Sequence, residues 1–320
     1  MTRADQPIHL PASWLAGTIS DLPTPFDDSD GIDFAAFERL CEREIEAGAK
    51  AMVVAETAGE ASTLTLAEHD AVVRAAVKTA RGRIRVIAGA GSNATSHAIE
   101  LSECCEAAGA DAILSVVPYY NKPMQDGICE HFRAIADATE LPIILHDIPS
   151  RTIRCLADET LVRLAESPQF VGLRDASGDM TRPLRLKSLL RPEFRLLSGD
   201  DTTALAFLLH GGDGCISPAA AIVPELCHDL TTSCQNGRLR TARSIAERLA
   251  PLSLALGRDM PAALKYALSL LDLMSPRVRL PMVELTEAEK AEIAGVIAGI
   301  CEEARLRKAD RRLRLESIRL

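Results

Sequence analysis

The sequence predicts an α/β protein in which eight parallel strands close into a TIM-type (β/α)8 barrel, followed by a C-terminal helical extension. The first observation is that short apolar runs alternate with amphipathic segments from Trp14 onward, which is the pattern of repeated β-α units. The second is that the apolar runs number eight, which a closed barrel accommodates most simply. A doubly wound open sheet is the alternative, but no Gly-x-Gly-x-x-Gly motif opens the first unit.

The expected strands are short and apolar, as strands covered on both faces of a parallel sheet are. They are 17–22, 51–55, 85–90, 112–117, 142–148, 170–173, 194–198 and 214–217.

Capping residues mark the expected helices. Asp33 precedes a helix at 34–47 and Thr65 precedes one at 66–80, while Gly48 and Gly109 stand where helix C-caps belong. Further helices are expected after the eighth strand, and Thr286 with Glu289 has capping-box spacing. They are 224–233, 238–256, 261–273 and 287–307.

These patterns divide the chain into a barrel (14–222), a helical annex packed on the barrel (223–304) and a basic tail (305–320). The tail carries seven basic residues against Asp310 and Glu316. A basic tail can contact an acidic surface or a polyanion, although a solvated helix extension or one packed on a neighbouring subunit is the simpler interpretation.

Composition describes a globular chain with ample material for a large core. Of 320 residues, 47% are hydrophobic and 25% are charged. The net charge of −9 argues against nucleic acid as the main partner. No apolar run reaches membrane-spanning length, and the first twelve residues lack a signal-peptide pattern. The nine cysteines include no Cys-x-x-Cys pair, which favours core thiols in a reducing cytoplasm.

The stretch 170–179 organises the expected site. It predicts a buried strand, apolar to Leu173, that continues into a polar Ser-Gly-Asp loop. In a barrel of parallel strands, the residue at which a strand gives way to its loop faces the reaction site. In this chain that residue is Arg174.

Motifs along most of the chain, 17–284, resemble those of the dihydrodipicolinate synthase and N-acetylneuraminate lyase family. The sixth-strand motif, Val171 to Asp179, is joined by seven others in the family's order. They are 24–26, 57–65, 88–93, 118–123, 149–152, 198–201 and 214–217.

The resemblance implies a Schiff-base lysine at position 174, where this chain has arginine. In the family that lysine forms an imine with pyruvate or another 2-oxo acid. An amine attacks a ketone once it is deprotonated, whereas a guanidinium keeps its charge at physiological pH and does not attack carbonyls. We therefore do not expect the chain to retain dihydrodipicolinate synthase activity.

Several positions match the family's binding residues. By resemblance, Thr57 holds the 2-oxo acid carboxylate and Arg151 clamps a second carboxylate, while Tyr120 reaches across a dimer interface into a neighbour's proton relay. The resemblance also assigns Gly199 and Ile216 to the substrate pocket. For the first three, a loop-stabilising hydrogen bond is the alternative, and Tyr120 could equally pack at an interface.

The departures from the family cluster where its chemistry is located. His146 stands in place of the strand-five tyrosine, and Asp147 in place of an asparagine. Ala58 replaces the second hydroxyl of a Thr-Thr pair and Glu56 replaces the glycine before it. Asp21 occupies a position on the first strand that is normally small and apolar.

A permanently charged Arg174 in the barrel requires an anionic partner or ligand. We expect an ion pair between Asp21 and Arg174, with Glu56 also near, unless Asp21 turns outward. His146 is a candidate general acid or base, or else a wall histidine bonded to Tyr120 or the backbone. Asp21, Glu56 and His146 form a weak candidate metal set without supporting spacing, and no cofactor is expected.

Other lysines offer no substitute nucleophile. Lys50, Lys122 and Lys265 do not fall at the C-terminal ends of strands, and solvated or tetramer-contact roles are expected for all three.

The first functional hypothesis is an enzyme of the lyase family's fold that handles a small carboxylate without an imine, with Arg174 stabilising an oxyanion and His146 moving the proton. The second is a catalytically silent homologue that binds carboxylates or serves as a structural partner. By resemblance, a homotetramer is expected in either case.

Overall fold

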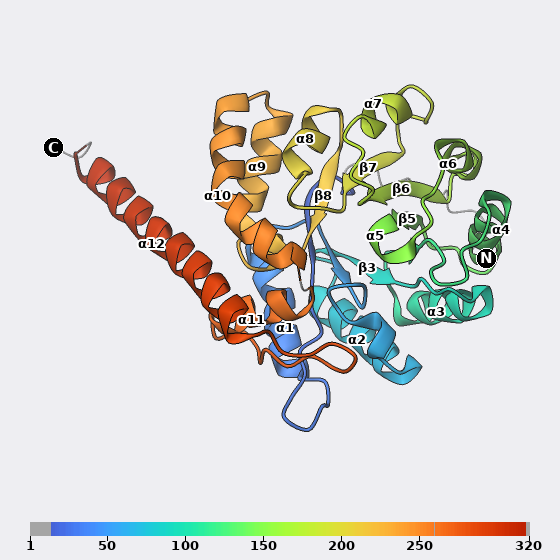
Figure 1. Cartoon of the computed structure of the whole chain (residues 1–320), viewed down its shortest axis with the longest axis horizontal. Helices are drawn as coiled ribbons and strands as arrows, with labels where there is room; N and C mark the ends of the chain where they lie inside the picture. Colours follow the sequence, from blue (N-terminus) through green and yellow to red (C-terminus); the bar gives the residue numbers. More distant parts are fainter. Residues whose placement is uncertain (1–13, 259, 318–320) are drawn as a thin grey trace.

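Eight parallel strands form a closed barrel in the order of the sequence, as predicted (Figure 1). The computed structural model describes residues 14–258 and 260–317. The strands are β1 (Gly17–Asp21), β2 (Ala51–Val54), β3 (Arg85–Gly89), β4 (Ala112–Val116), β5 (Ile143–Asp147), β6 (Phe170–Asp175), β7 (Arg195–Ser198) and β8 (Gly214–Ser217). Closure between β1 and β8 leaves no edge strand to protect.

Helices follow the strands and cover the outside of the barrel. They are α1 (Phe34–Glu46), α2 (Leu66–Ala80), α3 (Thr95–Ala108), α4 (Gln125–Ala136), α5 (Pro149–Thr152), α6 (Asp158–Ala165), α7 (Arg182–Lys187) and α8 (Ala204–Leu209), with 3-10 turns η2 (Ala61–Thr63) and η3 (Ala219–Ala221). The predicted caps are confirmed for α1 and α2: Asp33 accepts from the Ala36 amide, and Thr65 forms a complete capping box with Glu68. Gly109 ends α3 in the left-handed conformation.

The core has two layers. Branched and small side chains on the inward faces of the strands fill the lower barrel, and a larger cluster lies between the strands and the helices. The inner layer contains Leu15, Ile19, Ala51, Val53, Ile87, Ala112, Leu114, Ile144, Val171, Leu197 and Ile216.

Strand β6 carries one extra residue against β5, which sets the orientation of its last residues. Ile143 pairs with Phe170, but Ile144 pairs with Gly172, and the register then continues to His146 opposite Arg174. A Cβ at Gly172 would lie 2.9 Å from the Arg195 carbonyl oxygen, so only glycine fits there. The strand runs two residues further than predicted.

The C-terminal helices α9 (Pro224–Gln235), α10 (Leu239–Arg258), α11 (Ala262–Ser269) and α12 (Glu287–Ser317) follow the barrel. The predicted capping pair opens α12, where the Thr286 amide donates to Glu289 at 2.7 Å. Figure 1 shows α12, in red, extending away from the barrel. Of the predicted basic tail, 318–320 lie outside the described residues, and the expected division of the chain at 222 and 304 stays a prediction.

Among the described residues, no helix is long and apolar enough to cross a membrane. All nine cysteines are free thiols, and five of them are buried. The expectation of core thiols therefore holds for those five, whereas Cys155 and Cys301 are exposed.

Candidate functional site

Four ionisable side chains from four different strand ends meet inside the barrel. Arg174 on β6 donates from Nη1 to Glu56 Oε2 at 2.9 Å, and its Nη2 lies 2.8 Å from Asp21 Oδ2 at the end of β1. Glu56, just after β2, accepts through Oε1 from His146 Nδ1 on β5 at 2.9 Å. All four are buried. The predicted ion pair between Asp21 and Arg174 is confirmed, and we call these four residues the buried cluster.

Strand register brings the cluster together. His146 and Arg174 are directly paired across β5 and β6, and both side chains point inward toward β1 and β2. Gly199, after β7, leaves the room that the arginine needs, because a Cβ there would lie 3.0 Å from Arg174 Cγ. The cluster thus depends on the absence of a side chain at Gly199 as well as on its charged residues.

The charges of the cluster nearly cancel. Burial alone would lower the pKa of Arg174, but the two carboxylates more than compensate and keep it above its ordinary value. Burial raises the pKa of Asp21 to about 7 against the opposing influence of Arg174. Burial would likewise raise the pKa of Glu56, but His146 and Arg174 hold it well below its usual value. Near neutral pH, the Arg174 cation therefore faces an ionised Glu56 and a partly protonated Asp21.

His146 has one satisfied ring nitrogen and one that is not. Burial lowers its pKa although Glu56 opposes the shift, so the ring is neutral at pH 7. Because Glu56 is ionised, the proton is assigned to Nδ1, which leaves a lone pair on Nε2. Nε2 is buried and has no hydrogen-bond partner among the described residues. Within this chain the ring bonds Glu56 rather than Tyr120 or the backbone, the partners that the sequence left open.

A cavity of about 510 Å³ opens above the cluster. Glu56, Thr57 and Arg151 line it, with Ser92 and Tyr119 adding polar groups. Asp21, His146 and Arg174 lie behind this lining, and among the described residues no lysine belongs to it.

Arg151 and Thr57 are the lining groups best suited to an anion. Thr57 is partly buried, and its backbone N–H donates to Glu56 Oε2 at 2.5 Å. Arg151 belongs to α5, which begins with Pro149 at its first position. Its Nη2 donates to the Met260 carbonyl at 3.1 Å, and the side chain is otherwise exposed. Its charge is not neutralised by any carboxylate among the described residues.

The other predicted site residues lie in three different settings. Ala58 is fully buried below the cavity lining, and Ile216 belongs to the inner apolar layer of the barrel. Tyr120 is 87% exposed, with a positive φ of 69°, and does not line this chain's cavity, whereas Tyr119 does. Of the two, only Tyr119 contributes to the site within one chain.

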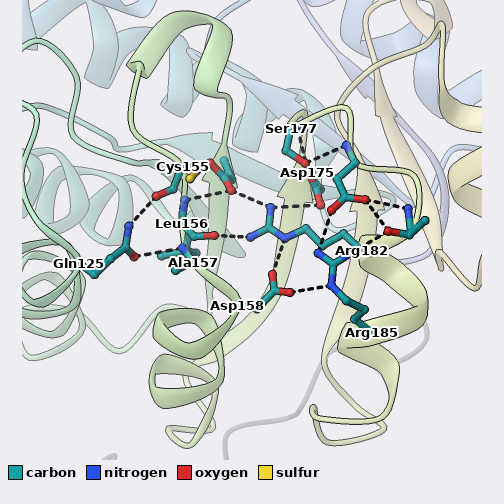
Figure 2. A network of polar contacts seen from close by, with 12 residues as sticks. Gln125, Cys155, Leu156, Ala157, Asp158, Asp175, Ser177, Arg182 and Arg185 are labelled. Carbon is teal, nitrogen blue, oxygen red and sulfur yellow. Dashed lines mark hydrogen bonds and ion pairs between the residues drawn. The ribbon is translucent and has the colours of Figure 1, made fainter.

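A second charge network lies immediately outside the buried cluster, and the sequence did not predict it. Figure 2 shows Arg182 of α7 between Asp158 and Asp175. Arg182 bonds Asp147 at 2.7 Å, Asp158 at 2.9 Å and Asp175 at 3.3 Å, and it donates to the Leu156 carbonyl at 2.5 Å. The network ties the ends of β5 and β6 to α6 and α7. The sequence contains a signal for this network, because Asp147 directly follows His146 and Asp175 directly follows Arg174.

The role expected for Lys265 was wrong. Its side chain is fully buried in α11, and its Nζ lies 2.5 Å from Glu60 Oε1 and donates to the Arg277 carbonyl at 2.9 Å. The sequence does contain a signal, because Lys265 is the only charged residue of an otherwise apolar helix, AALKYALS. A charge that faces a core requires a buried partner.

A metal site at the cluster is not supported by the geometry. Among the described residues, no group of three or more His, Cys, Asp or Glu side chains is arranged to hold a metal ion. Arg174 occupies the space between Asp21 and Glu56 that a cation would need.

Comparisons with known proteins agree on one family. Residues 14–299 match the model of the dihydrodipicolinate synthetase family. The 4-hydroxy-tetrahydrodipicolinate synthase of Hyphomonas neptunium is 48% identical over 285 residues, which are 88% of this chain and 97% of the relative. That of Gluconobacter oxydans is 44% identical over 289 residues, 90% of this chain and 97% of the relative.

Solved structures give the same result. The 4-hydroxy-tetrahydrodipicolinate synthase of Methylacidiphilum fumariolicum SolV superimposes with a TM-score of 0.88 at 36% identity, covering 92% of this chain and 98% of that one. Dihydrodipicolinate synthase from Aquifex aeolicus gives a TM-score of 0.87 at 36% identity, covering 89% and 98%.

Proposed function

Because the chain belongs to the dihydrodipicolinate synthetase family, we propose that it binds a small carboxylate, such as a 2-oxo acid, without forming an imine. In this proposal Arg174 stands in place of the lysine through which the family forms its Schiff base. Its location at the inner end of β6, against Asp21 and Glu56, supports that correspondence. The protein keeps the lyase fold and a cavity for the ligand but not the covalent step.

One observation carries the proposal: the cavity lining contains no lysine among the described residues, and the nearest cation at its floor is already neutralised. A guanidinium does not form imines with ketones. Since Arg174 is bonded to two carboxylates, it adds little net positive charge for an incoming anion. Arg151 and Thr57 are therefore assigned as the ligand-holding groups.

Borohydride trapping tests the absence of an imine directly. The purified chain is incubated with pyruvate and sodium borohydride, and its intact mass is measured. No added mass is expected, whereas a stoichiometric adduct mapped to any lysine would overturn the proposal. Arg174→Lys combined with Asp21→Ala and Glu56→Gly serves as the positive control, because a lone lysine beside two carboxylates would stay protonated.

Binding is tested separately with pyruvate and longer 2-oxo acids by calorimetry. Arg151→Ala is expected to weaken binding about tenfold or more, since a charge-assisted hydrogen bond contributes roughly 1.5–3 kcal/mol. Arg154→Ala is the matched control, because Arg154 is a nearby arginine that does not line the cavity. Equal loss in both variants would remove Arg151 from the site.

A second candidate function is non-covalent proton transfer by His146, favoured by the unpartnered lone pair of its buried Nε2. Although its two Nη atoms face carboxylates, Arg174 would then donate from Nε, which has no hydrogen-bond partner among the described residues, to the enolate oxygen. The measurement is deuterium uptake at C3 of pyruvate in D2O, followed by proton NMR. Uptake above the buffer rate that His146→Asn abolishes supports an enzyme. Binding without uptake supports a catalytically silent homologue, which can still act as a structural partner.

We also propose that the chain forms a homotetramer in which Tyr120 enters the neighbouring subunit's site. The large exposed apolar side chains Tyr120, Met124 and Ile153 support an interface on this side, at 87%, 76% and 65% exposure. Sedimentation should give four copies, and Tyr120→Glu should yield smaller species. A monomeric wild type would refute the assembly.

A further inference from the structure

Lys265 is a buried amine that the site described so far does not use. It projects from α11 with no exposed surface, and its Nζ lies 3.9 Å from the centroid of the Phe26 ring. Its ion pair with Glu60 and its hydrogen bond to the Arg277 carbonyl fix the ammonium between three parts of the chain. Such an arrangement keeps a buried charge tolerable only while all its partners remain in position.

Glu60 belongs to the segment that carries the candidate ligand site. Residues 56–64, which we call the rim segment, follow β2 and supply seven of the cavity-lining residues. Glu60 has a left-handed backbone, with φ at 52°, a conformation that a non-glycine residue keeps only where its surroundings hold it. Its Oε2 accepts the Arg279 backbone N–H at 3.0 Å, while Oε1 faces Lys265.

The same contacts connect the rim segment to the C-terminal annex. Arg279 donates to the Thr63 carbonyl at 3.1 Å and to Glu68, and its guanidinium lies 4.3 Å from the centroid of Phe26. Phe26 therefore contacts both Lys265 and Arg279. The helix α11 and the segment around Arg279, both distant from the rim segment in the sequence, hold it through these two cations. Pro281, close to Arg279, itself lines the cavity.

We propose that Lys265 is a positioning residue of the ligand cavity: through its ion pair with Glu60, it holds the rim segment so that Thr57 and Glu56 face the cavity and the buried cluster. This inference rests on the proposed function in that it takes the cavity to be the ligand site. Lys265 itself contacts no ligand. The amine is what the arrangement requires, because an apolar side chain of similar length would leave Glu60 buried and unpaired.

Titration of the amine has a defined sign. Burial lowers the pKa of Lys265 to about 8, although Glu60 opposes the shift. The charged groups that face the amine are Glu60 in the rim segment, Arg279 in the annex and Asp30 after β1. An opened rim segment would hold the proton more firmly than the closed one, so raising the pH from 7 to 9.5 favours the closed arrangement and should not loosen the rim segment.

Hydrogen exchange of the ligand-free full chain, read by mass spectrometry, tests the inference. Lys265→Met should speed exchange of peptides covering 55–65 about tenfold or more, with strands β4 to β6 unchanged, because only local opening is affected. The Ala61 and Thr63 amides, bonded within the rim segment at 3.1 and 2.9 Å, are the reporters. Lys290→Met, which removes a lysine of α12 paired with Glu284 and Glu287, is the matched control and should change nothing in 55–65.

Glu60→Gln, which removes the other side of the ion pair, keeps the test valid if Lys265→Met does not fold. Faster exchange confined to 55–65 is expected in this variant, whereas the wild type should exchange that segment no faster at pH 9.5 than at pH 7 after correction for the intrinsic rate. Unchanged exchange of 55–65 in a folded variant, or acceleration spread over the whole chain, would overturn the role of the ion pair.

Ligand binding is a separate arm. Where pyruvate binds the wild type, Lys265→Met should weaken it and Lys290→Met should not. If pyruvate and the other 2-oxo acids do not bind the wild type, the proposed function fails, whereas the exchange data still decide whether Lys265 holds the rim segment.

Discussion

Removing the cation of the buried cluster should be severely destabilising. In Arg174→Met, the Asp21 and Glu56 carboxylates lose partners at 2.8 and 2.9 Å while remaining buried. Breaking a buried pair on one side costs about 3–5 kcal/mol, a large fraction of the 5–15 kcal/mol that folded domains typically have. For a chain of this length, that corresponds to a melting temperature lower by about 4–8 °C.

The loss should also depend on pH in a defined direction. Without Arg174, both carboxylates bind protons more readily in the folded than in the unfolded chain, so stability falls as pH rises from about 4 toward 8. The penalty is therefore small at pH 5 and full at pH 8. Urea unfolding followed by far-ultraviolet circular dichroism at both pH values measures it.

Two further variants make the interpretation specific. Adding Asp21→Asn and Glu56→Gln to Arg174→Met removes the uncompensated charges and should recover most of the loss at pH 8. Arg185→Met, which removes a half-exposed arginine paired with Asp158 and Asp179, should cost no more than about 1 kcal/mol. A cost of Arg174→Met as small as that of Arg185→Met, or one independent of pH, would refute the cluster as described.

Two other substitutions test buried carboxylates elsewhere. Burial raises the pKa of Glu44 to about 7 although Ser20 donates to it at 2.5 Å. The wild-type fold should therefore lose up to about 3 kcal/mol of stability as the pH rises from 4.5 to 7. Glu44→Gln should remove this dependence of stability on pH in urea titrations, and an unchanged dependence would contradict the assignment. Arg182→Met leaves Asp147 and Asp175 without their cation and should cost about 3–5 kcal/mol at pH 7.5. Because burial raises the pKa of Asp147 to about 6 even with Arg182 present, the cost should shrink at pH 5, and a larger cost there would show that the carboxylates are not the cause.

The barrel could be predicted from the sequence because its strands are apolar runs between clear capping and turn residues. The boundaries were least accurate where polar residues belong to strands. Asp175 looks like the start of a loop, yet it pairs with Asp147 and Ser198 in the sheet. When a strand ends in charged residues, an apolar pattern does not reveal its last hydrogen-bonded positions.

The buried cluster was partly predictable for a physical reason: a guanidinium expected inside a barrel requires a carboxylate, and Asp21 and Glu56 were the candidates at neighbouring strand ends. The partner of His146 was missed because the choice between Glu56 and Tyr120 depends on the direction of each side chain. The link between Lys265 and Glu60 was missed because it joins an annex helix to a loop after β2, and no local pattern reports such a distant contact.

The alternation along β5 and β6 has a consequence for how the chain reaches its native state. His146 and Arg174 face one side of the sheet, and the very next residues, Asp147 and Asp175, face the other, each pair meeting opposite charges there. A slip of one position between these strands would exchange the two sides and set like charges against each other in a dry interior. Mispaired strands are thus penalised electrostatically, so these polar residues help to specify the register between β5 and β6.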